Sequence, residues 1–213
     1  MQNCLGIYIE NNLIKYAKVS KDRDTFKVDA FGIRFFDNLN EAIKKIVEET
    51  YSFTTPISIN LANEQYLYYD IFALLSKNDI QKTVETEFET FCDENKYNQK
   101  AFETRYALVS NVQNKERIKA IQVIVNKIEL NKQKQYLEKH NLSGILPIGT
   151  AIASITRFEK KENVLIVNME EKTTITTIYD RQIYNVETID RGSQEVLEKI
   201  NRTENSMSKA YEI

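Results

Sequence analysis

Short apolar runs separated by polar turns open the chain and predict strands. Residues 4–9 and 13–19 flank the turn Glu10-Asn11-Asn12, a pattern typical of a β-hairpin. Apolar and polar side chains alternate again over 25–35, which predicts a third strand. The chain therefore begins with three strands in succession.

A helix and a fourth strand follow. Asn38 and Glu41 have the spacing of a helix capping box, and apolar residues recur at helical period up to position 47. Pro56 then precedes an apolar strand at 57–61. The first sixty residues predict the order β-β-β-α-β.

Residues 65–147 form a second block with its own apolar faces. Its signals follow the order β-α-β-β-α-β: strands at 66–72, 102–110, 117–125 and 145–147, and helices from Asp79 to Phe91 and 129–140. Because this block interrupts the larger pattern, we expect a small inserted domain.

The last part of the chain repeats the opening pattern. A helix is predicted over 150–158, a buried strand over 164–167, and a hairpin over 173–179 and 182–189. Ser193 is placed to cap a final helix that extends through Ile200. We expect a mixed α/β protein with one discontinuous domain, residues 1–64 and 148–213, around an insert at 65–147.

Charge and reactive residues exclude several classes of function. With 29 basic and 31 acidic residues in 213, the net charge is −2, which gives no field to attract nucleic acid. Cys4, Cys92 and His140 match no metal-ligand or catalytic spacing, so no metal site is expected. There is neither a signal peptide nor an apolar run of about 20 residues, which predicts a cytoplasmic protein without membrane insertion.

The order of elements resembles half of an actin-like ATPase, an RNase H-like fold in which two hairpin turns hold the phosphates of a nucleotide. The run from Leu5 to Lys15 resembles the first phosphate loop, and that from Val164 to Thr174 resembles the second. The insert after Leu61 points to PilM and FtsA, with PilM favoured. Residues 189–197 and the closing residues 208–213 also resemble this family.

Both loops depart from the family pattern Asp-x-Gly. The first loop holds Tyr8 and Glu10 at those positions, and the second reads Asn168-Met169-Glu170. A glutamate in place of glycine brings a side chain and a negative charge towards a phosphate, a repulsion of about 4 kcal/mol near a protein surface. The lost aspartates also remove the expected Mg²⁺ ligands. The positions left as degenerate phosphate contacts are Glu10, Asn11, Asn12, Lys15, Asn168, Glu170, Thr173 and Thr174.

These departures, together with a length that suits only the first lobe, predict a protein without ATPase activity. No cofactor is expected for this chain, and ATP with Mg²⁺ only in a complete two-lobed parent. An active sugar-kinase-like enzyme on the same fold is disfavoured by the loss of both Asp-x-Gly patterns.

The resemblance implies a PilM-like adaptor of type IV pilus assembly. Its partner would be the N-terminal peptide of a single-pass membrane protein, docked as an extended segment beside the insert, which would place the chain at the inner face of the membrane. The aromatic residues at the start of the insert suit such a peptide, although they equally suit packing between the two domains: Tyr66, Tyr68, Tyr69 and Phe72.

An FtsA-like cell-division protein with nucleotide-dependent assembly is the alternative. The membrane-targeting amphipathic helix of that class has no counterpart in residues 208–213, which are short and polar. We expect a monomer or weak self-association.

Overall fold

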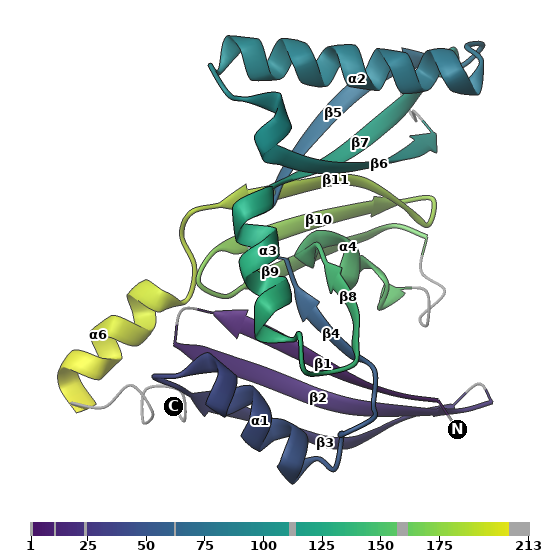
Figure 1. The fold of residues 1–213 in the computed structure, drawn as a ribbon. Coiled ribbons are helices and arrows are strands. Elements are labelled where there is room, and N and C mark those ends of the chain that lie inside the picture. Colours follow the sequence, from purple (N-terminus) through teal and green to yellow (C-terminus); the bar gives the residue numbers. More distant parts are fainter. Residues whose placement is uncertain are drawn as a thin grey trace.

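A five-stranded mixed sheet forms the base of the protein (Figure 1). The computed structural model describes residues 2–10, 12–23, 25–61, 63–110, 114–156 and 162–204. In the sheet order β3-β2-β1-β4-β8, the first three strands pair antiparallel, and β1, β4 and β8 run parallel. The bounds are β1 Gln2–Glu10, β2 Leu13–Asp22, β3 Thr25–Phe35, β4 Ile57–Asn60 and β8 Leu142–Leu146.

Helix α1, Leu39–Glu49, covers one face of this sheet. The Asn38 side chain caps it by accepting a hydrogen bond from the Glu41 backbone N–H at 3.2 Å. Ile43 and Ile46 project from the helix into the core and are fully buried. They pack there with apolar residues of the sheet: Leu5, Ile7, Ile14, Ile57 and Ile59.

A second sheet, in the order β5-β7-β6, lies at the opposite end of the molecule under helix α2, Lys77–Glu94 (Figure 1). Helix α2 packs on it through Ile80, Val84, Phe88 and Cys92. The short helix η1, Gln99–Ala101, leads into the edge strand. The strands are β5 Gln65–Phe72, β6 Phe102–Ser110 and β7 Arg117–Asn126.

A third sheet, in the order β11-β10-β9, lies between the other two (Figure 1). Helix α3, Lys127–Tyr136, leads from β7 back to β8, and the short helix α4, Ile148–Ala153, packs on β10 and β11. Helix α6, Gln194–Glu204, follows the third sheet. Its strands are β9 Val164–Met169, β10 Thr173–Tyr179 and β11 Gln182–Ile189.

The mixed α/β class and the order of elements are as predicted. The sequence did not indicate to which sheet two of the segments belong. The strand expected to close the insert is β8, and it pairs with β4 in the five-stranded sheet. The strands after residue 148 form a sheet of their own, so 1–64 and 148–213 do not share one sheet. Hydrophobic pattern identifies a strand but not its neighbour, so these pairings could not be predicted from the sequence. We therefore propose that the insert ends with β7. The closing segment 208–213 lies outside the described residues.

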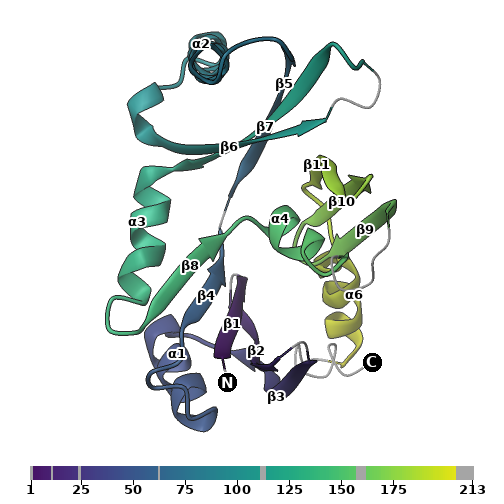
Figure 2. The ribbon, with the colours of Figure 1, turned by 90° about the vertical axis from the view of Figure 1, so that its right-hand side faces the viewer.

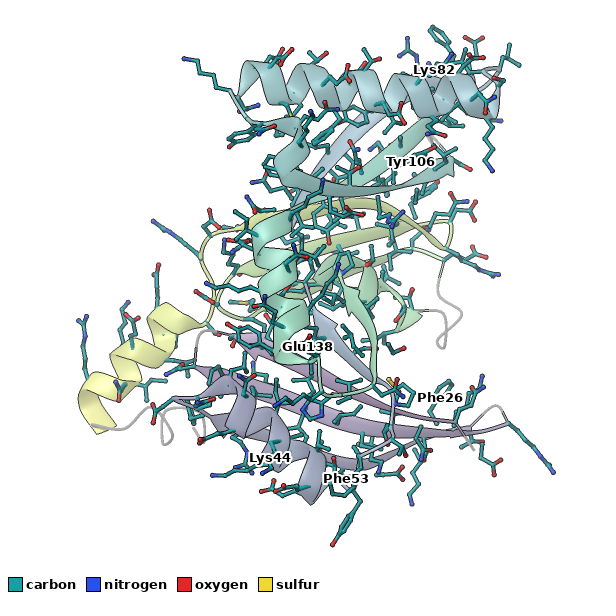
Figure 3. All side chains as sticks on the ribbon, viewed as in Figure 1. Phe26, Lys44, Phe53, Lys82, Tyr106 and Glu138 are labelled. Atoms are coloured by element: carbon teal, nitrogen blue, oxygen red, sulfur yellow. The ribbon has the colours of Figure 1, made fainter. Side chains whose placement is uncertain are left out.

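Replacing Ile46 with alanine tests the α1 contact. We expect Ile46→Ala to lower the free energy of unfolding by about 2–5 kcal/mol, because it opens a cavity beneath the sheet. Lys44→Ala on the same helix is the matched control. The Lys44 side chain is 72% exposed and points to solvent, so its loss should change stability by less than about 0.5 kcal/mol (Figure 3). Urea unfolding measures both, and equal losses would contradict this account of the core.

Candidate functional site

The two hairpin turns that resemble phosphate loops contact each other directly. Lys15 on β2 forms an ion pair with Glu170, at the turn between β9 and β10. Beside it, the Glu10 carboxylate at the end of β1 accepts a hydrogen bond from the Glu171 backbone N–H at 2.8 Å. Side chains from positions about 160 residues apart therefore join the five-stranded sheet to the third sheet.

Glu10 is the half-buried centre of this contact. Besides the Glu171 N–H, its carboxylate accepts a hydrogen bond from the Tyr8 hydroxyl at 3.3 Å. Burial raises the pKa of Glu10, and the Glu170 carboxylate raises it further, while the Glu171 N–H and Lys15 act in the opposite direction. Burial together with Glu10 and Glu170 also raises the pKa of Tyr8, which stays protonated and donates. The contact therefore centres on a half-buried carboxylate that accepts from the Tyr8 hydroxyl and the Glu171 N–H.

The backbone of the second turn is held from its far side. The Glu170 carbonyl accepts hydrogen bonds from the Ser193 N–H at 2.7 Å and from the Ser193 hydroxyl at 3.1 Å. Gly192 allows this approach, because a Cβ at that position would lie 1.9 Å from the Glu170 carbonyl oxygen. An ion pair between Lys172 and Asp190 at 2.8 Å closes the same turn. Contacts with residues 190–193 thus hold the second turn independently of its contact with the first hairpin.

The structure brings together only part of the predicted phosphate-contact set. Lys15, Glu10 and Glu170 meet, as described. Thr173 is buried and donates its hydroxyl to the Arg191 carbonyl at 2.7 Å, and Thr174 is buried in the third sheet, so neither faces the turn opposite. Asn12 is exposed, and Asn11 lies outside the described residues.

A mainly apolar cavity of about 430 Å³ adjoins this contact. Asn168 and Glu170 line it from the third sheet, and Tyr8 and Lys15 from the first. Its remaining walls are largely aliphatic: Ile7, Ala17, Ile59, Leu146, Ile148, Ala151 and Ile152. Its one cation is already paired with Glu170, so the cavity offers little to a polyphosphate.

The tyrosines predicted to bind a partner instead join the inserted sheet to the rest of the protein. The Tyr68 hydroxyl bonds both the N–H and the carbonyl of Val186 on β11, each at 2.6 Å. Burial raises the pKa of Tyr68 to about 12. The Tyr66 hydroxyl donates to Glu64 at 3.2 Å and accepts from the Gly149 N–H at 3.2 Å. These bonds favour the packing interpretation of the aromatic set.

The other two aromatic residues also have partners within the chain. Tyr69 packs under α2 and bonds the Gln122 side chain at 3.0 Å. Phe72 is 56% exposed, and the Arg117 guanidinium lies over its ring at 4.6 Å. None of the four predicted residues lines the cavities described in this section.

A groove of about 1240 Å³ lies beside the inserted sheet and was not predicted from the sequence. Strand β6, helix α3, strand β8 and helix α4 frame it (Figure 2). Two of these elements, β6 and β8, are the end strands of their sheets. Leu108 and Leu146 are both 44% exposed at its rim. The apolar residues near the end of β6, among them Leu108, are the one signal in the sequence, and they point to this groove only once the sheet order is known.

Two classes of site find no support in the described part of the chain. There, no group of three or more His, Cys, Asp or Glu side chains is placed to hold a metal ion. No described helix combines the length and the apolar character that a membrane span needs.

The fold is found in known structures, although the sequence alone identifies no relative. No protein-family model matches the chain, and no curated protein matches it in sequence. A structure described as a PilM–PilN type IV pilus biogenesis complex superposes with a TM-score of 0.76 and 14% identity, over 98% of this chain and 68% of that one.

The cytoplasmic domain of EpsL also superposes. EpsL is an inner-membrane component of the type II secretion system of Vibrio cholerae, and the match has a TM-score of 0.63 and 13% identity over 92% of this chain and 74% of that one. These likenesses establish the fold, with sequence identity too low to carry more. The chain thus has the fold of PilM, and with it the actin-like architecture that its hairpins predict.

Proposed function

We propose that this protein is a non-catalytic adaptor that holds an extended peptide of a membrane-anchored assembly protein in the groove beside the inserted sheet. The observation that carries the proposal is the groove itself, which has two strand edges and a mainly apolar lining in a PilM-like fold. Strand edges give a peptide backbone its hydrogen bonds, and apolar pockets select its side chains. The proposed partner site therefore moves from the β5 tyrosines to this groove.

The cytoplasmic face of a pilus or secretion machine is the proposed setting. Both structures that share the fold belong by description to such machines, one to type IV pilus biogenesis and one to type II secretion. That favours the pilus-type role over the FtsA-like alternative. The adaptor would reach the membrane only through its partner and act as a monomer or weak self-associating unit.

A role without nucleotide is part of the same proposal. In the family, phosphate oxygens accept hydrogen bonds from the loop backbone, whereas here the Glu10 carboxylate accepts from the Glu171 N–H and Lys15 is paired with Glu170. A bound phosphate would have to displace a carboxylate and lie close to two glutamates. The hairpins already have, in their own side chains, the contacts that a nucleotide would supply.

Peptide binding is the first test. The probes are synthetic 15-residue peptides that cover the cytoplasmic N-termini of the source organism's single-pass inner-membrane proteins, each labelled with fluorescein. We expect at least one to bind the full chain in fluorescence anisotropy. Ala107→Arg should weaken that binding about tenfold, because Ala107 lines the groove and is exposed on β6.

Thr86→Arg is the matched control, since it adds the same side chain to an exposed position of α2 outside the groove. It should leave the affinity unchanged. Binding that both variants weaken equally, or that neither weakens, would place the peptide elsewhere and remove the basis of the adaptor role.

Nucleotide binding is tested by thermal unfolding with Mg-ATP. We expect no rise in Tm at millimolar Mg-ATP, because the phosphate-binding positions are occupied by Glu10 and Glu170. A rise of several degrees that Lys15→Ala abolishes would show that the hairpins still bind nucleotide.

The pH dependence of stability tests the buried carboxylate. Because the folded-state pKa of Glu10 is raised above its unfolded value, its contribution to stability is greatest in acid and is lost as pH rises through the folded pKa. Glu10→Gln removes this titration and keeps an oxygen for the Glu171 N–H. The stability of the variant minus that of the wild type should therefore increase from pH 4 to pH 7 in urea unfolding. A difference independent of pH would mean that Glu10 is not buried as described.

A further inference from the structure

Among the described strands, none pairs with the second edge of β6. In the order β5-β7-β6 it pairs only with β7, and all of its residues from Glu103 to Ser110 line the groove. Residues of α3 and β8 line the groove as well, and Figure 2 shows how these two elements lie relative to β6. An uncovered edge presents backbone donors and acceptors that a further strand can pair with.

The backbone groups that face this edge can be identified. The Ser110 N–H donates to the Gln182 side chain of β11 at 2.9 Å, so it points away from β7. Because N–H groups of a strand in an antiparallel pair alternate between its two edges, those of Leu108, Tyr106 and Thr104 point the same way. The Gln182 side chain thus accepts from the Ser110 N–H at the end of β6. The outward N–H groups of Leu108, Tyr106 and Thr104 face the groove.

Both faces of the sheet are apolar next to this edge. Tyr106 and Leu108 are 38% and 44% exposed on the face that carries α2 (Figure 3). Ala107 and Val109 stand on the opposite face, where Ala107 pairs with Ile121 and Val109 with Lys119 on β7. A strand that is covered on both faces has consecutive apolar residues rather than an alternating pattern. The edge therefore suits a segment that is apolar without interruption.

Charge around the groove adds a second requirement. Its lining includes three cationic side chains, Arg105, Lys134 and Arg181, against one carboxylate, that of Glu103. Glu103 lies 3.6 Å from Arg105, and Glu162 lies 3.3 Å from Arg181, so the excess of positive charge in the described lining is that of Lys134. An occupant with a carboxylate beside its apolar run complements this excess.

We propose that β6 receives the partner as an added strand, through the N–H and carbonyl groups of Thr104, Tyr106 and Leu108. The partner segment is extended, has about seven residues to match Glu103–Val109, contains consecutive apolar side chains and carries a flanking carboxylate. This inference rests on the proposed adaptor function, and it specifies the chemistry of the partner.

A proline in β6 tests the backbone pairing. The probe is the tightest-binding peptide of the N-terminal set, labelled with fluorescein. Leu108→Pro removes an outward N–H and leaves the bonds to β7, whereas Leu108→Ala shortens the side chain and keeps the N–H. We expect the proline variant to bind at least tenfold more weakly than the alanine variant, with an unchanged far-UV circular dichroism spectrum. Equal affinities for the two variants would overturn the inference.

An N-methyl scan of the same peptide covers the case in which the proline variant does not fold. Methylation at every second residue of the apolar run should weaken binding about tenfold, and methylation at the residues between should not, because only alternate N–H groups face β6. Uniform sensitivity would overturn strand addition. In addition, Arg105→Glu should weaken the probe, and replacing its flanking Asp or Glu with Ala should remove that effect. A probe that binds equally well to Arg105→Glu would contradict the carboxylate requirement.

The outcomes separate the two claims. If Ala107→Arg abolishes binding while Leu108→Pro and N-methylation have no alternating effect, the groove binds peptide in another manner and only the inference fails. If no peptide of the set binds the wild-type chain, the proposed function and the inference fail together.

Discussion

The contact between the two hairpin turns fixes how the first sheet lies against the third. It includes an ion pair between Lys15 and Glu170 and a hydrogen bond from the Glu171 N–H to the Glu10 carboxylate. Hydrogen bonds to charged groups contribute about 1.5–3 kcal/mol, more than neutral ones, but burial of Glu10 offsets part of that gain. The contact therefore has a defined geometry but contributes little net free energy of stabilisation. The hydrogen bond from the Ser193 N–H to the Glu170 carbonyl holds the second turn in position for its contact with the first turn.

A second joint holds the inserted sheet. Tyr68 spans from β5 to Val186, and Tyr66 with Glu64 reaches the start of α4, where the Ile148 N–H donates to Glu64 at 2.7 Å. These bonds join the sheet that contains β6 to β11 and α4. The groove thus depends on how the sheets are joined, because residues from several elements line it.

Local pattern predicted the elements well, because each depends on residues close in sequence. The hairpins, the Asn38 cap and the strand β3 all appear as expected, although Phe26 and Val28 of β3 are exposed. The sheet to which β8 belongs could not be predicted, since a five-residue strand such as Leu142–Leu146 carries no signal for its partner β4.

The same limit applies to the site. The sequence could place Lys15 and Glu170 in opposite loops, but not reveal that they pair, because that contact joins residues 155 positions apart. Tyr66 and Tyr68 are aromatic residues of the kind found at partner sites, and in the structure their hydroxyls form hydrogen bonds with Gly149 and Val186 of the same chain. The free edge of β6 depends on the order of three strands, which hydrophobic periodicity does not encode.

The two cavities share a wall, and this links the hairpin contact to the groove. Ala151 on α4 and Leu146 on β8 line both the apolar cavity beside the hairpins and the groove under β6. A movement of α4 on one side therefore changes the shape of the other. Here Glu10, Lys15 and Glu170 already join the hairpins, so on the proposed function the groove keeps its shape without a nucleotide.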